Sequence, residues 1–245
     1  LADIDADGDL DYLAGNSNNA VTAGVSRLYA NDQSTTIVNA APSAPATGFG
    51  ATIVAAYNTI TTIDSTADVG AFASTTLGID GFPVMSYHDF TSSDLRVVKC
   101  GNAACTAGNS LTTVDSLGLV GAFTSIAIST DGFPTISYFD VAGANLKTVK
   151  CGNAACTLAN IIITLDSTGS PGETAVVVPS DGRAVIAYLY NISGDLRVVK
   201  CGDATCSIGN VITTVDSTGV VGQYASAIVG GDGLPVISYY DATNG

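Results

Sequence analysis

Short apolar runs that alternate with small polar residues recur along most of the chain. In the second of the recurring segments, four stretches show this alternation: residues 124–129, 135–140, 146–151 and 161–166. Turn-forming residues separate the stretches, first Asp131-Gly132, then Gly143 with its alanine neighbours, then a short loop between two cysteines. A period of two is typical of half-buried strands, and no helical period of 3.6 is present. The pattern predicts an all-β protein.

The alternating segments form a repeat. The phrase TTIDSTADVGAF, which begins at residue 61, returns in related form near residues 112, 163 and 213, and its aspartates are spaced 51, 51 and 50 residues apart. Four antiparallel strands per repeat are typical of a β-propeller blade. We therefore predict a β-propeller of four-stranded antiparallel blades with about five units. A β-solenoid is the alternative.

The repeats suggest two parts of the chain. Residues 1–48 would form a partial blade with an acidic loop and a Pro-containing linker, and residues 49–245 would form the tandem repeats. Within the second part we place the units near residues 61–111, 112–162, 163–212 and, incomplete, 213–245. Since the chain opens inside a motif and closes inside a repeat, we expect it to be a piece of a longer product.

The net charge of the chain argues against nucleic acid and anionic lipid as partners. The chain has 8 basic and 22 acidic residues, a net charge of −14, and all but one of the acids are aspartate. Such a surface repels nucleic acid and anionic lipid. No apolar run is long enough to span a membrane. With 47% hydrophobic residues, the chain has ample material for a core.

Six cysteines occur as three close pairs. Each pair lies in the phrase CGNAAC or CGDATC: Cys100 and Cys105, Cys151 and Cys156, Cys201 and Cys206. A disulfide within each pair is the simplest interpretation, and it implies an oxidising compartment. Zinc is the alternative, but each pair offers two ligands and His88, the single histidine, stands apart.

The N-terminal stretch DIDADGDLD predicts a metal loop. Five aspartates alternate along it, namely Asp3, Asp5, Asp7, Asp9 and Asp11. Gly8 permits a sharp turn, so the carboxylates of Asp3, Asp5 and Asp7 could face one centre, with Asp11 closing the loop and the carbonyl of Asp9 adding a ligand. Calcium prefers six to eight oxygens of this kind. An acidic, solvated turn is the alternative.

Residues 1–33, with the loop followed by DYLAGN and SRLYAND, resemble the FG-GAP/VCBS family of calcium-loop propeller blades. The resemblance implies calcium on an extracellular β-propeller with adhesion, ligand-binding or carbohydrate-related roles. The strand before the loop is nearly missing, and no second such loop occurs. The units from residue 61 onward do not match that family's loop and look like propeller repeats of bacterial secreted proteins.

Repeated polar residues are candidates for a binding face. If the units are blades, one face collects seven aspartates: Asp64, Asp115, Asp166, Asp216, Asp89, Asp140 and Asp241. Alternatively, they cap strand ends and turns. Six bases recur on the third strand of the units: Arg96, Lys99, Lys147, Lys150, Arg197 and Lys200. Because acids lie on neighbouring strands, we expect cross-strand ion pairs rather than a functional ring.

The sequence contains no recognisable set of catalytic residues. The single histidine excludes a Ser-His-Asp triad, the cysteines are paired, and no aspartate pair differs from its repeat copies. The repeated tyrosines could be sugar platforms or, as we expect, core between blades: Tyr87, Tyr138, Tyr188 and Tyr239.

We therefore expect a non-enzymatic, secreted binding or adhesion module with a protein or glycan ligand at the cell surface. The second hypothesis is a subunit of a surface filament that associates head to tail by completing its unfinished last blade. The third is a secreted carbohydrate-active hydrolase. Fibres in electron micrographs, glycan-array binding and turnover assays would separate the three.

Overall fold

The computed structural model describes residues 27–28, 60–66, 68–169 and 171–245. The protein is all-β, and its described residues form three four-stranded antiparallel sheets. Sheet 1 contains β3 (Val69–Leu77), β4 (Pro83–Asp89), β5 (Asp94–Lys99) and β6 (Ser110–Asp115). Sheet 2 contains β7 (Val120–Ile128), β8 (Pro134–Asp140), β9 (Asn145–Lys150) and β10 (Ile161–Asp166). Sheet 3 contains β11 (Pro171–Val177), β12 (Val185–Tyr190), β13 (Asp195–Lys200) and β14 (Val211–Asp216).

Two shorter pairs of strands accompany the sheets. The terminal hairpin consists of β15 (Val221–Val229) and β16 (Pro235–Asp241), and β1 (Arg27–Leu28) pairs with β2 (Thr61–Thr62). Each sheet is a meander in sequence order, which excludes the β-solenoid alternative. Among the described residues, no helix is long and apolar enough to cross a membrane.

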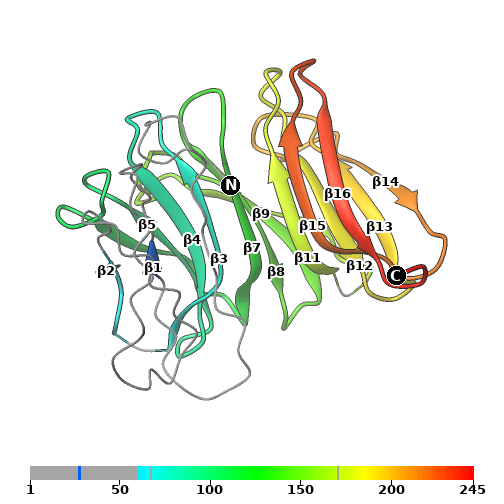
Figure 1. Ribbon diagram of the computed structural model, residues 1–245, viewed down its shortest axis with the longest axis horizontal. Coiled ribbons are helices and arrows are strands. Elements are labelled where there is room, and N and C mark those ends of the chain that lie inside the picture. The colour runs from blue at the N-terminus through cyan, green and yellow to red at the C-terminus, as the bar shows by residue number, and fades with distance from the viewer. Residues whose placement is uncertain (1–26, 29–59, 67, 170) are drawn as a thin grey trace, which may run out of the picture.

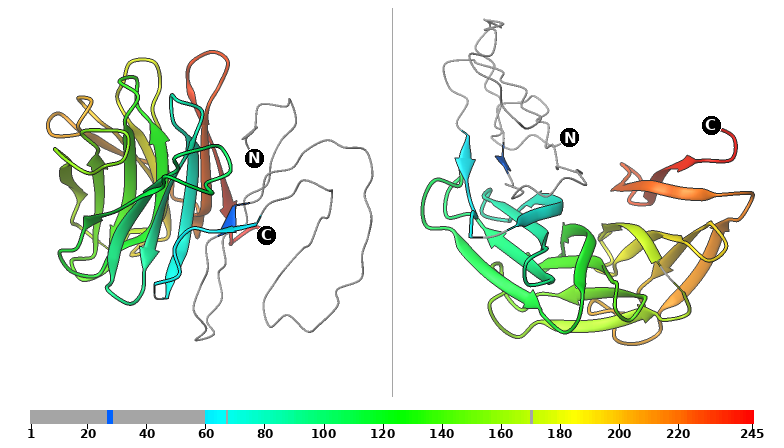
Figure 2. Two further views of the ribbon diagram at one scale, coloured as in Figure 1. Left: turned by 90° about the vertical axis from the view of Figure 1, so that its left-hand side faces the viewer. Right: turned by 90° about the horizontal axis from the view of Figure 1, so that it is seen from below.

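The sheets lie side by side along an arc (Figures 1 and 2). Their first strands β3, β7, β11 and β15 pack successively against one another, so these strands lie on the inner side of the arc. Apolar side chains fill the space between sheets. Between sheets 1 and 2, for example, Val84 and Leu95 pack with Ile136, Tyr138 and Val149. Burial of such faces is the main stabilisation between adjacent sheets.

Hydrogen bonds between first strands fix how adjacent sheets meet. The Ile126 N–H donates to Ser74 Oγ at 3.2 Å, and the Val176 N–H donates to Ser125 Oγ at 3.1 Å. Ser74 and Ser125 hold the same repeat position. In β3 and β7, a serine therefore satisfies a backbone donor of the next sheet.

The strand prediction for sheet 2 differs from the structure mainly at its first strand. The second, third and fourth strands fall within a residue of the predicted bounds, but β7 begins at Val120 rather than at residue 124. The phrase VGAF, which precedes the predicted strand, forms a bulged start of β7. Gly121 and Phe123 have φ of 92° and 51°, and the β7–β8 register shifts twice there. Bulges of this kind disrupt the alternation from which strands are predicted.

Sheet 3 has one bulge residue fewer. Its first strand β11 shifts register once against β12, between Pro171 and Thr174, whereas β7 shifts twice against β8. The missing residue explains why Asp166 and Asp216 are 50 residues apart while the other copies are 51 apart.

The β1–β2 pair repeats the register of a third and a fourth strand. Arg27 lies opposite Thr62, as Arg96 lies opposite Thr113 in the β5–β6 ladder. Thr62 and Thr113 are 51 residues apart, one repeat length. By register, β1 is therefore a third strand and β2 a fourth strand.

Candidate functional site

One edge of the sheets gathers the repeated aspartates. At this edge, which we call the carboxylate edge, first strands begin, second strands end, third strands begin and fourth strands end. Five of the seven aspartates proposed as a binding face are buried: Asp64, Asp89, Asp115, Asp140 and Asp166. Asp216 and Asp241, at the terminal hairpin, are only partly covered.

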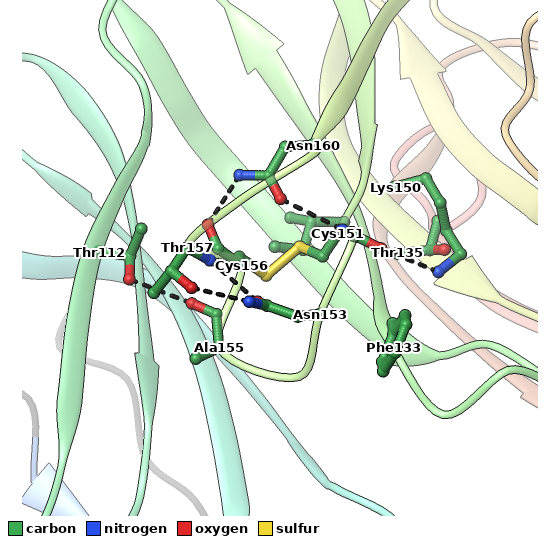
Figure 3. Close-up of a disulfide and its surroundings, with 12 residues drawn as sticks. Thr112, Phe133, Thr135, Lys150, Cys151, Asn153, Ala155, Cys156, Thr157 and Asn160 are labelled. Atoms are coloured by element: carbon green, nitrogen blue, oxygen red, sulfur yellow. Dashed lines mark hydrogen bonds between the residues drawn. A yellow bond between two sulfur atoms is a disulfide. The ribbon is translucent and has the colours of Figure 1, made fainter.

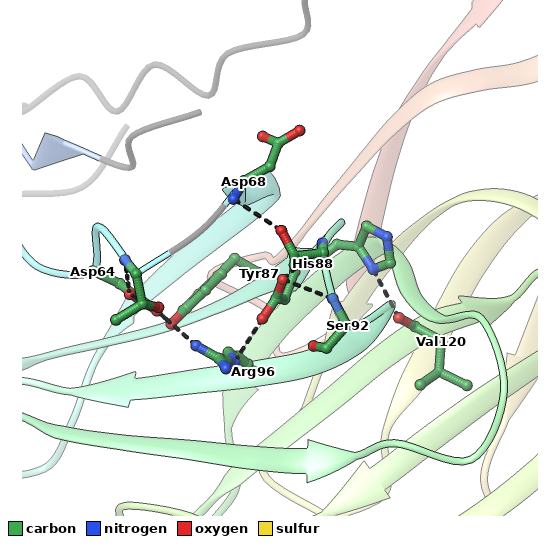
Figure 4. A network of polar contacts seen from close by, with 10 residues as sticks. Asp64, Asp68, Tyr87, His88, Ser92, Arg96 and Val120 are labelled. Carbon is green, nitrogen blue, oxygen red and sulfur yellow. Dashed lines mark hydrogen bonds and ion pairs between the residues drawn. The ribbon is translucent and has the colours of Figure 1, made fainter. Parts of the chain in front are cut away.

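In sheet 1 these carboxylates join strands of two different sheets (Figure 4). The Tyr87 hydroxyl donates to Asp64 Oδ2 at 2.8 Å, and Arg96 Nη1 donates to the same oxygen at 3.0 Å. Arg96 Nε also lies 3.0 Å from Asp89 Oδ2, but its N–H is not aimed at that oxygen, so this contact is an ion pair rather than a hydrogen bond. Because Asp64 follows β2, this network connects β2 to β4 and β5. We call such a network of an aspartate with a tyrosine and a base a latch.

The latch keeps its carboxylate ionised. Burial opposes ionisation of Asp64, but the hydroxyls of Tyr87 and Thr66 and the guanidinium of Arg96 outweigh it, so the pKa of Asp64 lies below its ordinary value. Burial, together with the hydrogen bond to Asp64, raises the pKa of Tyr87 well above its ordinary value. Tyr87 is therefore a neutral donor and Asp64 a charged acceptor at neutral pH.

Sheets 2 and 3 repeat the latch with variations. The Tyr138 hydroxyl donates to Asp115 Oδ2 at 2.7 Å, and Lys147 Nζ lies 3.1 Å from the same oxygen. In sheet 3, Arg197 lies 3.4 Å from Asp166. Tyr190 occupies the position of Asp89, and the Arg197 guanidinium lies 3.4 Å from the centroid of its ring. A cation–π contact thus replaces the second ion pair.

The predicted cross-strand ion pairs are confirmed at both edges. Besides the latches, three lysines at the opposite edge contact Asp-Gly turns: Lys99 with Asp80 at 2.8 Å, Lys150 with Asp131 at 2.9 Å, and Lys200 with Asp181 at 3.3 Å. The tyrosines of the three sheets are buried, as expected for core between units. That the carboxylates form a ligand-binding face stays a prediction.

The three predicted disulfides are present at the edge opposite the carboxylate edge. In sheet 2, the loop closed by Cys151 and Cys156 is braced by Asn160, whose side-chain amide donates to the Cys156 carbonyl at 2.7 Å (Figure 3). Thr112 of sheet 1 donates to the Ala155 carbonyl at 3.0 Å. The disulfide loop of sheet 2 is therefore braced internally and also contacts sheet 1. The disulfides indicate an oxidising compartment.

The single histidine, His88, is buried between sheets 1 and 2. Its Nδ1 lies 2.8 Å from the Val120 carbonyl oxygen, so Nδ1 carries the proton and donates. Its ring packs edge-on against Phe90, with centroids 4.6 Å apart. Burial lowers the pKa of His88 despite that hydrogen bond and the nearby carboxylates of Asp89 and Asp94.

The predicted calcium ligands Asp3, Asp5, Asp7, Asp9 and Asp11 lie outside the described residues. Among the described residues, no group of three or more His, Cys, Asp or Glu side chains is arranged to hold a metal ion. Calcium binding by the N-terminal loop therefore stays a prediction.

A row of aromatic side chains lies on the first strands near the carboxylate edge. The aromatic row consists of Phe72, Phe123 and Tyr224, which share one repeat position and a positive φ of 51–53°. The rings of Phe72 and Phe123 are 4.5 Å apart, and Phe72 also lies 6.1 Å from Phe90. Phe90 is 51% exposed and Tyr224 is 70% exposed. Unlike the aspartates, these rings offer accessible surface.

Glu173 interrupts the aromatic row. It directly precedes Thr174 in β11, just as Phe123 directly precedes the equivalent Thr124 in β7. Its Oε2 accepts a hydrogen bond of 2.9 Å from the Tyr224 N–H. It has no ion-pair partner in the part of the chain that the structure describes. The one glutamate of the chain therefore lies between aromatic positions on the inner side of the arc.

Our sequence analysis overlooked this arrangement. The signal was present, because the single glutamate coincides with the repeat that is one residue shorter. The phrase VGAF lies outside the predicted strands, so its aromatic residue was not compared between copies. Only the bulged geometry shows that Phe72, Phe123, Glu173 and Tyr224 belong to one set.

No family model and no curated protein matches the chain. A solved structure of a protein of unknown function from Dyadobacter fermentans is similar with a TM-score of 0.55 and 10% identity, over 75% of this chain and 61% of that one. A thermostable family-43 glycoside hydrolase has a TM-score of 0.48 and 14% identity, over 70% and 65%. The chain thus spans about three fifths of these proteins. At such identities only a fold is shared, and no activity is carried over.

Proposed function

We propose that the protein is a non-catalytic, extracellular binding or adhesion module of the β-propeller class. The observation that carries the proposal is the aromatic row with Glu173. Ligand sites typically combine apolar and aromatic surface with a few placed polar groups. Phe90 and Tyr224 offer exposed rings, and Glu173 offers one carboxylate among them. A glycan fits this chemistry, because sugar faces stack on rings while hydroxyls donate to a carboxylate.

Several features support the propeller. The sheets are antiparallel meanders that pack face to face in an arc, and β1–β2 has the register of a preceding unit. Sheets 1 to 3 and the terminal hairpin follow one another as successive blades would, and a total of about five units stays a prediction. The disulfides support secretion. The resemblance of residues 1–33 to FG-GAP/VCBS blades supports calcium as a stabilising ion.

A glycan array combined with two substitutions tests the binding role. We expect Phe90→Ala and Glu173→Gln each to reduce binding to the preferred glycan at least about tenfold, a loss typical of a central contact. Leu158→Ala, an exposed apolar residue at the disulfide edge, is the matched control and should bind normally. Binding that both site variants retain would argue against this site. Turnover of a carbohydrate that disappears in Glu173→Gln would instead favour the hydrolase hypothesis.

A structural subunit of a surface assembly is the second candidate. It is favoured by the terminal hairpin, where β16 pairs only with β15 in the described part of the chain. Unpaired strand edges are ready templates for another strand. A head-to-tail contact of this kind is heterologous, and it builds an open filament when the rotation from copy to copy does not close a ring. Electron micrographs of the native material should then show fibres, and discrete particles at every concentration would contradict this role.

A further inference from the structure

We propose that the free edge of β16 accepts a third strand, and that β1 of a second copy of this chain fills it. The inference deepens the assembly role described above and rests on it, but it does not depend on the aromatic row. It follows from three features of the described residues: an unpaired edge, two carboxylates without a base, and a strand whose register matches the vacant position.

The edge of β16 is the place of a missing strand. In each of the three sheets, the second strand pairs with the first strand on one side and the third strand on the other. In sheet 1, for example, Ser86 lies opposite Ser74 in β3 and opposite Val97 in β5. Ser238 of β16 corresponds to Ser86 and lies opposite Ser226 in β15. No described strand pairs with the other edge of β16.

The terminal hairpin also exposes apolar side chains that are buried at the equivalent positions of the three sheets. Val236 and Tyr240 of β16 are 55% and 43% exposed, while their counterparts in the three sheets are buried. Ile228 of β15 is also largely exposed. This surface continues the interface that joins sheet to sheet along the arc.

The charges at this edge select a basic strand. In sheet 1, Asp64 and Asp89 together hold Arg96 of the third strand. In sheet 2, the corresponding pair holds Lys147, at 3.1 Å and 3.7 Å. Asp216 and Asp241 have the same two repeat positions at the hairpin, and neither has a basic partner in the described part of the chain. An incoming strand is therefore favoured if it carries a base at the Arg96 position.

β1 meets this requirement. Its register against β2 places Arg27 at the position of Arg96 and Leu28 at the position of Val97. Its one ladder among the described residues is with β2, a fourth strand, and no described strand pairs with its other edge. The hairpin supplies a first and a second strand, and β1–β2 supplies a third and a fourth strand. Together they make one complete sheet in which Arg27 would lie between Asp216 and Asp241.

The arrangement favours a second copy of the chain as the source of the third strand. In the structure, β1–β2 and the terminal hairpin lie at opposite ends of the arc (Figure 2). Joining the hairpin of one copy to β1 of another uses two different surfaces of the chain, so the contact is heterologous and repeats from copy to copy. Pairing by strand addition supplies main-chain hydrogen bonds, and the aspartates supply register.

A thiol pair tests both the register and the source. Ser86 and Val97 are opposed in sheet 1, so Leu28→Cys with Ser238→Cys should form a disulfide under mild oxidation. In an equimolar mixture of ¹⁴N- and ¹⁵N-labelled protein, mass spectrometry should find the bridge between differently labelled chains. Leu28→Cys with Leu234→Cys, which places the second thiol before β16, is the control and should not cross-link. Absence of the 28–238 bridge, or a bridge found only within single chains, would overturn the proposal.

Charge exchange tests the chemistry without added thiols. We expect Arg27→Glu to weaken self-association at least about tenfold in sedimentation velocity. Arg27→Glu combined with Asp241→Arg should restore it. Arg27→Glu combined with Asp203→Arg, on a disulfide loop, should not. Circular dichroism would confirm that each variant is folded. Self-association that is unchanged in Arg27→Glu would overturn the proposal, while glycan binding by these variants would report separately on the aromatic row.

Discussion

Gly121 sets how closely sheet 2 approaches sheet 1. A Cβ at this position would lie 2.8 Å from the Leu95 Cα, and the residue has φ of 92°. Gly81 has a similar φ of 76°, but a Cβ there meets nothing within 4 Å. The two glycines therefore separate the cost of backbone conformation from the cost of a steric clash.

We expect Gly81→Ala to lower the free energy of unfolding by about 1–2 kcal/mol, the cost of a left-handed conformation for a residue with a Cβ. Gly121→Ala should cost clearly more, because the backbone of Leu95 must also move. Urea denaturation of the two variants makes the comparison. Equal losses would show that the close approach of the sheets is not set by this glycine.

His88 should make stability depend on pH. Its pKa is lowered in the folded state, so the unfolded chain binds its proton more tightly. Its contribution is present above the unfolded pKa of about 6.5 and is lost as pH falls below that value. We expect the melting temperature to decrease from pH 7 to pH 5. His88→Leu, which introduces the residue of the equivalent position Leu189, should flatten that decrease; an identical slope in the variant would contradict this assignment.

At the scale of strands, the latch joins each fourth strand to the next sheet. Asp115 ends β6 and binds Tyr138 and Lys147 of sheet 2, and all three side chains are largely buried. Asp216 ends β14 and binds Tyr239 in the same way, but it is more exposed and lacks a base among the described residues. The same substitution at the two positions therefore compares a complete latch with an incomplete one.

We expect Asp115→Asn to reduce the free energy of unfolding by about 3 kcal/mol, because it removes the nearer of the two carboxylates that hold the largely buried Lys147 ammonium. Asp216→Asn should produce a smaller loss. Thermal and urea unfolding of both variants tests this order. If Asp216→Asn were as damaging as Asp115→Asn, burial and the base would not be what strengthens the latch.

The elements were predictable to different degrees. The second, third and fourth strands alternate cleanly and are flanked by turns or cysteine loops, so their bounds follow from the pattern. The start of each first strand does not, because a bulge with positive φ at Phe72 and Phe123 breaks the alternation. The aromatic row lies on that bulge, and for this reason the candidate site was missed while the disulfides and ion pairs were anticipated.

At the scale of the whole molecule, calcium is expected to stabilise the N-terminal unit. If Asp3, Asp5, Asp7, Asp9 and Asp11 hold the ion in the folded state only, binding adds to stability by mass action. We expect EDTA to lower the melting temperature in calorimetry, and excess calcium to restore it. Asp5→Asn with Asp7→Asn should abolish the difference. A melting temperature that does not respond to EDTA would remove the metal from this description.

The sequence by itself determined the strand content, the repeat length, the local pairing of the cysteines and the opposition of bases to acids. These features depend on residues that are close along the chain or related by one repeat. Only the tertiary structure decided that the aspartates are buried between sheets, that Glu173 interrupts a row of rings, and that β1 has the register of a third strand. These features depend on bulges and on contacts between units, where a one-residue shift in register changes which side chains meet.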